Sequence, residues 1–276
     1  MLFSTVFGIP NFGQVMLYSF KPLLILGWIA ACSFAFKSDE DGGINVVVID
    51  AGHGGKDIGT RGRISKEKDV VLDLTMKLAR KIKTDMPEVK VILTRASDKF
   101  VDLSERSSIA NRRKADLFIS IHCNSLPKNK VSPAGTETFV MGLHKSDENF
   151  EVAKRENAVI LLEKDYEERY KGFNPNSPLA YIMLANRQNA YIASSLNFAG
   201  KIERQFQKYA DRNSRGVKQA GFMVLWQTAM PSVLVEAGFL SHAEEERYLN
   251  SEEGQDQITE SIFRAFKQYK EEVESN

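Results

Sequence analysis

The sequence predicts an α/β fold, with a single mostly parallel mixed sheet and helices on both of its faces. Short runs of β-branched and aliphatic residues are bounded by Gly, Asn or Ser, as buried strands are. Segments with apolar residues at helical spacing lie between these runs. The chain has 276 residues, of which 43% are hydrophobic and 26% charged, enough for one large domain of this class.

The first half of the chain alternates predicted strands and helices. The helix at 67–84 carries an apolar stripe at helical spacing, formed by Val70, Val71, Leu74, Leu78 and Ile82. A second helix is predicted at 102–114. The predicted strands are 45–50, 89–94, 117–122 and 135–142.

The second half contains two short apolar runs, FMVLWQ at 222–227 and SVLVEAG at 232–238, which are close enough to be neighbouring strands. A helix is expected near 188–210, and the last helix near 254–272. The apolar stripe of the last helix has spacings of four, four and three, and consists of Ile258, Ile262, Phe266 and Tyr269.

An insertion at about 145–185 separates the strand at 135–142 from the helix near 188–210. A plain crossover in an α/β unit needs only a few loop residues. The first half of the insertion is typical of a charged amphipathic helix, and GFNPNSP then breaks the chain. The expected apolar stripe of this helix is Phe150, Ala153, Ile160 and Leu161. Because the insertion leaves the carboxyl end of a strand, we expect it to emerge beside any site at that edge.

Three of the apolar runs end at a polar side chain that can hold a metal or move a proton. His53 follows VVVIDAG, His122 ends LFISI, and Glu236 ends VLV. Open α/β sheets gather their ligands at the carboxyl ends of the strands. The three side chains are therefore expected to form one composite site.

Glu67 completes this set, because it opens the helix that follows the first strand and so begins at the same edge. Two imidazoles and one carboxylate, with one position left for water, are typical of catalytic zinc. We therefore predict one Zn²⁺ per chain, held by His53, Glu67 and His122. Glu236 remains as a general base near that water.

Other polar residues have supporting or unrelated roles. Asp50 and Asp57 are candidates to orient a ligand imidazole from behind. Arg95 and Arg106 could meet carboxylates of a peptide, although pairing with surface carboxylates is the simpler expectation. The remaining two histidines lie outside the metal set, and His242 is expected to cap the helix HAEEERYL.

At these residues the sequence resembles the zinc-dependent N-acetylmuramoyl-L-alanine amidases of bacterial cell-wall turnover, the Amidase_3 type. Four ordered blocks carry the likeness, which covers about 44–272: IDAGHGGKDIG, Glu67, ISIHCNS and SVLVEAGFLS. The resemblance implies an Amidase_3-like catalytic domain with the zinc ligands named above and Glu236 as catalytic acid/base. It implies hydrolysis of the amide between N-acetylmuramic acid and L-alanine of the peptidoglycan stem peptide, in wall turnover or daughter-cell separation.

The resemblance also suggests a role for the insertion. Some relatives carry a helix at this place that blocks the site until a partner protein withdraws it. We therefore hypothesise a regulatory lid, opened by an activator protein, in which a Glu takes the open zinc position. Glu156 and Glu163 are both candidates. The alternative is an exposed helix with a solvated charged face.

Two other functions compete with the amidase. A zinc carboxypeptidase or endopeptidase acting on the stem peptide would use the same chemistry. A catalytically silent wall-binding activator would not need the complete set of ligands and base. A nucleic-acid partner is not expected, because the formal net charge is only +1.

The first 35 residues are predicted to be an export signal. PLLILGWIAACSFAF follows Lys21 and is shorter than a membrane span requires. Cleavage after Ala35 would release a soluble protein, whereas IAAC, ending at Cys32, resembles a lipoprotein box. Met16 is an alternative start to Met1. The expected location is the periplasm or cell envelope, with an outer-membrane lipoprotein as the alternative.

Cys123 is the only cysteine expected in the mature domain, so no disulfide can form within it. It neighbours His122 on a predicted strand, where successive side chains point to opposite faces. We therefore expect a buried structural thiol that points away from the site.

Overall fold

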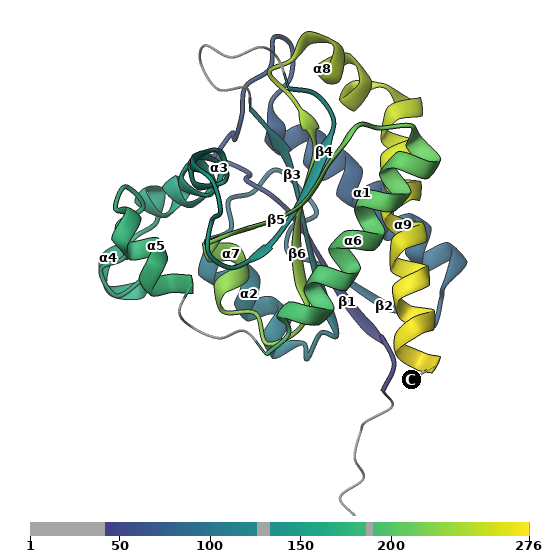
Figure 1. Cartoon of the computed structure of the whole chain (residues 1–276), viewed down its shortest axis with the longest axis horizontal. Helices are drawn as coiled ribbons and strands as arrows, with labels where there is room; N and C mark the ends of the chain where they lie inside the picture. Colours follow the sequence, from purple (N-terminus) through teal and green to yellow (C-terminus); the bar gives the residue numbers. More distant parts are fainter. Residues whose placement is uncertain (1–41, 126–132, 186–189, 276) are drawn as a thin grey trace, which may run out of the picture. The chain divides into compact units, whose positions relative to one another are not determined.

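The computed structural model describes residues 42–125, 133–185 and 190–275 of the chain (Figure 1). Residues 40–276 form one compact unit. The predicted export signal at 1–35, with Cys32 and Ala35, lies outside the described residues. In the described part, no helix is long and apolar enough to cross a membrane.

Six described strands form one sheet in the order β2-β1-β3-β6-β4-β5. All neighbours are parallel except β4 and β6, which are antiparallel. This confirms the mostly parallel mixed sheet. The strands are β1 (Val46–Ala51), β2 (Lys90–Leu93), β3 (Leu117–Asn124), β4 (Thr136–Met141), β5 (Ser214–Ala220) and β6 (Ser232–Phe239).

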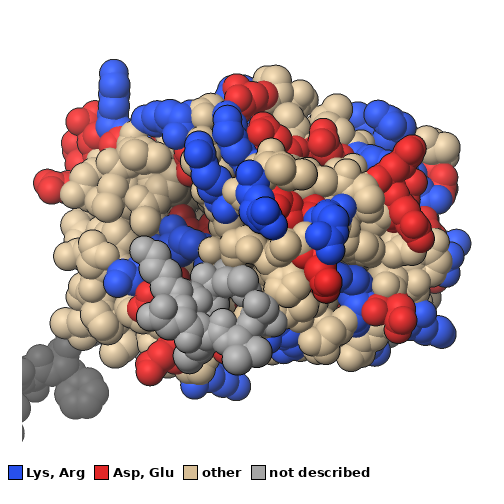
Figure 2. Space-filling model, turned by 90° about the horizontal axis from the view of Figure 1, so that it is seen from above, with Lys and Arg blue, Asp and Glu red and all other residues tan. Residues whose placement is uncertain are grey.

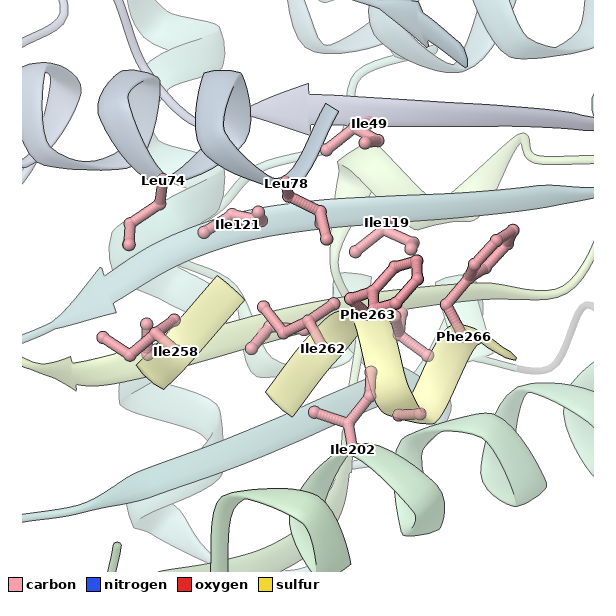
Figure 3. Close-up of a cluster of buried hydrophobic side chains, with 14 of the residues drawn as sticks. Ile49, Leu74, Leu78, Ile119, Ile121, Ile202, Ile258, Ile262, Phe263 and Phe266 are labelled. Atoms are coloured by element: carbon pink, nitrogen blue, oxygen red, sulfur yellow. The ribbon is translucent and has the colours of Figure 1, made fainter. Parts of the chain in front are cut away.

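Helices cover both faces of the sheet, as predicted (Figure 1). One face packs against α1 (Glu67–Asp85), α6 (Ile192–Ala210) and α9 (Glu252–Ser275). Figure 3 shows this core, in which strand residues such as Ile119 meet Leu78 of α1 and Ile262 of α9. The other face packs against α2 (Leu103–Arg112), α7 (Met223–Trp226) and the insertion.

One predicted element in the second half needs correction, and one strand there was not predicted. FMVLWQ is not a strand, because most of it forms the short buried helix α7. A short apolar run cannot by itself distinguish a buried strand from a buried helical turn. The strand in this region is β5, whose sequence SRGVKQA is polar because it lies half-exposed at the edge of the sheet.

The insertion is helical, but its elements are shorter than expected. It contains α3 (Asp147–Asn157), the 3₁₀ helix η1 (Ala158–Leu162), α4 (Tyr166–Arg169) and α5 (Pro178–Ala185). Ala153 and Ile160 are buried as predicted, whereas Leu161 is exposed. Leu161 leaves the predicted stripe because α3 ends at Asn157 and the tighter 3₁₀ turn changes the register.

The insertion does not emerge at the edge that the sequence suggested. Because β4 runs antiparallel to β6, its carboxyl end lies at the opposite edge of the sheet from that of β6. The helix α3 therefore has to bring the chain back towards the carboxyl ends of β1, β3 and β6. The helix α8 (Ala243–Asn250) follows β6 at that same edge, and His242 caps it by accepting from two backbone N–H groups, as predicted.

Charged side chains of both signs lie next to one another over the face shown in Figure 2. This distribution agrees with the near-neutral net charge of the chain.

Candidate metal centre

His53 is positioned by a loop that leaves the carboxyl end of β1. Its backbone has φ 59°, in the left-handed region that a histidine seldom adopts. Arg106 donates to the carbonyls of Ala51 (2.7 Å) and His53 (2.8 Å), and Arg95 donates to that of Gly52 (2.7 Å). Both guanidinium groups are buried, so the expectation that they pair at the surface is wrong. They hold the backbone of the loop that carries His53 instead.

Asp50 supports this loop rather than an imidazole. Its carboxylate accepts hydrogen bonds from Thr94 (2.5 Å), Arg106 (2.8 Å) and Ser120 (2.7 Å). Burial raises the pKa of Asp50, but Arg106 together with the hydrogen bonds from Thr94 and Ser120 lowers it overall. The structure therefore places Asp50 behind Arg106, and not where it was expected.

Asp57, in contrast, touches the imidazole of His53. Its Oδ2 lies 2.7 Å from His53 Nδ1. A carboxylate at this distance accepts the Nδ1 proton and leaves Nε2 with its lone pair free for a metal. Nε2 lies 3.0 Å from Oε1 of Glu67.

Glu67 is the first residue of α1, and two backbone N–H groups from other segments hold its carboxylate in place. Oε2 accepts from Thr60 (2.7 Å), and Oε1 accepts from Cys123 (2.8 Å). The side chain of Cys123 points into the core on the other side of β3, as predicted. Oε1 of Glu67 also lies 3.2 Å from Nδ1 of His122, so this oxygen faces both imidazoles.

Two glycines leave room for these side chains. A Cβ at Gly52 would lie 2.5 Å from the His122 ring. Gly59 has φ 66°, and a Cβ there would lie 2.6 Å from both Glu67 and His53. Neither position can carry a side chain without moving a candidate ligand.

A fourth donor comes from the insertion. Oε2 of Glu156, near the end of α3, lies 3.2 Å from His53 Nε2 and 3.1 Å from His122 Nδ1. Both Glu156 and Glu163 were candidates on sequence grounds, and the structure brings only Glu156 to this cluster. Glu163 lies at the start of α2, where it accepts from the backbone N–H of Leu103 (2.8 Å) and from Tyr170 (2.7 Å).

The four donor groups fit a single cation. One ligand atom from each of His53, Glu67, His122 and Glu156 lies within 4.8 Å of all the others. The nitrogen–oxygen separations of 3.0–3.2 Å are close to the edge of a tetrahedron, about 3.3 Å, for ligands near 2.0 Å from zinc. His53 Nε2, His122 Nδ1 and Glu156 Oε2 are buried and have no hydrogen-bond partner among the described residues. Such orphaned atoms are expected where a metal satisfies them.

The charges of the cluster also indicate a cation. Burial lowers the pKa of His122, but Glu156 and Glu67 raise it overall to about 9. Burial likewise opposes the charge on Glu156, yet Arg155 and His122 hold its pKa well below the ordinary value. In the chain without metal, protons on the imidazoles thus offset the carboxylates. Binding a divalent cation would release such protons.

Glu236 lies beside His122 on the neighbouring strand, because the two residues are register partners in the parallel pair β3–β6. It is fully buried, and neither carboxylate oxygen has a hydrogen-bond partner among the described residues. Burial and the negative charge of Glu156 raise its pKa well above the ordinary value. Glu236 is therefore a candidate to accept and donate a proton beside the cluster.

Arg155, which contacts Glu156 and Glu236, was not singled out from the sequence. Its guanidinium lies 2.9 Å from Oε1 of Glu156, 3.0 Å from the side-chain oxygen of Asn124 and 3.6 Å from Glu236. Its position before Glu156 is the only signal in the sequence, because arginines on charged helices are usually solvated.

A family model, two relatives and a solved structure are all similar to this chain, and all are N-acetylmuramoyl-L-alanine amidases. The family model described as N-acetylmuramoyl-L-alanine amidase (Amidase_3) matches residues 47–268. The chain is 33% identical over 230 residues to the amidase AmiC of Escherichia coli O6:H1, which covers 81% of this chain and 52% of AmiC. It is 32% identical over 229 residues to AmiA of E. coli K12, which covers 82% of this chain and 76% of AmiA. The chain thus spans about half the length of AmiC.

A solved structure shows the same fold. The catalytic domain of CwlV, an N-acetylmuramoyl-L-alanine amidase from Bacillus (Paenibacillus) polymyxa var. colistinus, superposes with a TM-score of 0.60 at 29% identity. The match covers 82% of this chain and 98% of that domain.

Proposed function

The chain belongs to the N-acetylmuramoyl-L-alanine amidase family, Amidase_3, and on this premise we propose that it is a zinc-dependent peptidoglycan hydrolase. It cleaves the amide between the lactyl group of N-acetylmuramic acid and the L-alanine of the stem peptide. The observation that carries the proposal is the buried cluster of His53, Glu67 and His122, whose ligand atoms converge beside Glu236.

His53, Glu67 and His122 would hold the zinc ion, and the position facing Glu156 is the one that a substrate or water would use. A zinc ion bound there supplies a positive charge for the carbonyl oxygen and an acidified water. Asp57 keeps the imidazole of His53 in the tautomer that presents Nε2.

Glu236 moves the proton. It accepts a proton from the attacking water and then delivers it to the amine of L-alanine, which leaves poorly unless it is protonated. The position of Glu236 supports this role, because it is fully buried and is the register partner of His122 in the sheet.

Glu156 makes the described conformation an inhibited one. Its carboxylate faces both imidazoles at 3.1–3.2 Å, in the place where the open position of a catalytic zinc would lie. The insertion 145–185 therefore acts as a regulatory lid. An activator protein would have to draw α3 away before peptidoglycan could enter.

Digestion of purified peptidoglycan tests this function. The full chain, and the same chain with Glu156→Ala, are incubated with and without a chelator, and the products are identified by mass. We expect intact stem peptides and sugar chains with free lactyl groups, formed faster by the variant and only without chelator. Shortened peptides would indicate a carboxypeptidase or endopeptidase instead. No product from either chain would indicate a silent wall-binding activator.

The location follows from the substrate. The amidase acts outside the cytoplasmic membrane, so residues 1–35 act as an export signal that leads the domain to the periplasm or cell envelope. Cleavage after Ala35 yields a soluble enzyme, and lipidation at Cys32 yields an anchored one. Mass analysis of the mature N-terminus distinguishes the two.

A further inference from the structure

A pair of cations on β5 lies close to the site but has no role in the proposed mechanism. Nε of Arg215 lies 2.8 Å, and Nζ of Lys218 2.5 Å, from the same carboxylate oxygen of Glu137. Glu137 is fully buried, and its other oxygen accepts from Asn124 (2.5 Å). The cations are mostly shielded from solvent, with side chains 22% and 15% exposed.

The pair lies at the edge of the sheet that carries the metal donors. Glu137, at the start of β4, is the register partner of Glu236 on β6. Asn124, which follows His122 on β3, bonds both Glu137 and Arg155. Glu137 therefore bonds both cations and is the direct neighbour of Glu236 in the sheet.

The lid covers the cation pair with a second carboxylate. Glu148, at the start of α3, forms an ion pair with Nη2 of Arg215 and lies 4.0 Å from Nζ of Lys218. Glu148 and Glu156 are eight positions apart on one helix, or about 12 Å along its axis. Val152 and Glu156 are buried, whereas Glu148 is 47% exposed and lies at the margin of the face that α3 buries.

The balance of charge around Arg215 and Lys218 depends on whether α3 is in place. With the lid in place, two cations face two carboxylates. Without Glu148, Glu137 is the one carboxylate of the described residues that still pairs with both cations, and one positive charge is left without a carboxylate partner. The guanidinium end that Glu148 releases is a donor fork suited to another carboxylate.

We propose that Arg215 and Lys218 form a subsite for a carboxylate of the stem peptide, which the lid fills with Glu148. The inference rests on the proposed function. In the substrate the lactyl carboxyl group is already consumed in the amide, and N-acetylated sugars carry no charge. The only carboxylates are therefore on the peptide side of the bond. In the closed state two carboxylates of α3 thus occupy positions that the substrate would use: Glu156 at the metal and Glu148 at the peptide subsite.

The test uses the full chain carrying Glu156→Ala, so that the site is open. Two muropeptides are compared: one with free peptide carboxylates, and the same compound with those carboxylates amidated. We expect the parent to prefer the free form, and Arg215→Gln to raise KM for that form about tenfold, as loss of a charged hydrogen bond would. The kcat value and the KM of the amidated form should change little. Arg215→Lys should restore part of the preference.

Two controls distinguish a lost carboxylate contact from a general change in charge or a loss of folding. Arg264→Gln removes an exposed arginine of α9 and should leave both KM values unchanged. The melting temperature of Arg215→Gln reports any loss of folding, and Lys218→Gln gives an independent second variant. Equal loss on both muropeptides, or no loss on either, would overturn the subsite.

A binding measurement keeps the inference separate from the amidase assignment. Calorimetric titration of the open chain with the free stem peptide needs no turnover. Tighter binding of the free than of the amidated peptide, lost in Arg215→Gln, supports the subsite even if no amide is cleaved. Equal affinity overturns it, while the proposed function is judged by the zinc-dependent release of stem peptides alone.

Discussion

At the scale of single residues, His53 shows how the site is held. A left-handed backbone at a residue other than Gly costs roughly 1–3 kcal/mol and persists only where the surroundings impose it. Arg95 and Arg106 impose it here through hydrogen bonds to the carbonyls of the loop. As a result, Nε2 of His53 faces Oε1 of Glu67 even without a bound metal.

Asp57→Asn tests the control of His53 by its neighbour. An amide at this position accepts the Nδ1 proton less well than a carboxylate, so zinc affinity should fall about 10–100-fold. Zinc titration with a competing chelator measures this. Asp98→Asn is a matched control, because Asp98 bonds Gly55 and Lys68 in the same loop region but no imidazole. Equal affinities in the two variants would contradict the role of Asp57.

Glu236→Gln separates catalysis from metal binding. The amide keeps the shape of the side chain but cannot carry the proton, so kcat should fall about 10²–10⁴-fold. The zinc content, measured by atomic absorption, should stay near that of the parent. A variant that retains nearly full activity would remove Glu236 from the mechanism.

At the scale of elements, the insertion contacts the rest of the fold at more than one place. Glu156 reaches the metal donors, and Glu163 ties the next part of the insertion to the start of α2. Arg169 adds an ion pair with Asp102 at the same end of that helix (2.5 Å). The end of α3 and the segment that follows η1 are therefore both held against the rest of the fold.

Glu163→Ala tests the second contact. It removes the acceptor for Leu103 and for the Tyr170 hydroxyl, at a cost of about 1–2 kcal/mol to the closed state. We expect basal amidase activity to rise several-fold, with unchanged zinc affinity. Glu167→Ala, on the exposed side of α4, is the control and should leave the rate as it was. A rate no higher than that of the parent would show that this contact does not restrain the lid.

A contact between α8 and the loop before α1 predicts that the stability of the fold depends on pH. Glu246 of α8 accepts from the backbone N–H groups of Arg63, Ile64 and Ser65, in the loop that leads to Glu67. Burial raises its pKa, but these hydrogen bonds lower it overall from 4.5. Because the folded pKa is depressed, the stabilisation is present above about pH 4.5 and disappears as the pH falls through the folded value.

Glu246→Gln should therefore destabilise the chain at pH 7, by about 1–3 kcal/mol for the loss of charged hydrogen bonds. The difference from the parent should shrink in denaturant titrations below about pH 4.5. Glu244→Gln, an exposed neighbour on α8, is the control. A difference that stays constant down to low pH would contradict the assignment.

At the scale of the whole molecule, the direction of the strands assembles the site. The carboxyl ends of β1, β3 and β6 meet at one edge, and α1 begins there. The reversed strand β4 brings Glu137 to the same edge by its amino end. The candidate metal donors, Glu236 and the cation pair thus come from segments that are far apart in the sequence.

Zinc should stabilise this whole arrangement, because it binds donors that only the folded chain brings together. At a free concentration of 100 times its Kd, zinc should add about 2.7 kcal/mol to the free energy of unfolding. Thermal unfolding should show a higher midpoint with zinc and a lower one with chelator. His122→Ala should abolish the difference, and a parent that is insensitive to zinc would contradict the site.

Much of this protein could be predicted from local sequence patterns. The strands that carry His122 and Glu236, the helix that opens at Glu67 and the fold class followed from runs of apolar residues. The errors arose where a local pattern was ambiguous. FMVLWQ has the composition of a strand but forms a buried helical turn, and the polar edge strand β5 has no apolar run to reveal it.

The sequence by itself determined which side chains are available at the carboxyl ends of the strands, because a strand's burial and its end are properties of a few adjacent residues. Only the tertiary structure decided that Glu156, and not Glu163, faces the imidazoles, and that Arg215 and Lys218 both pair with Glu137, the neighbour of Glu236 in the sheet. Those positions depend on the reversal of β4 and on where α3 ends. Both are set by packing between distant segments, which no local pattern of residues records.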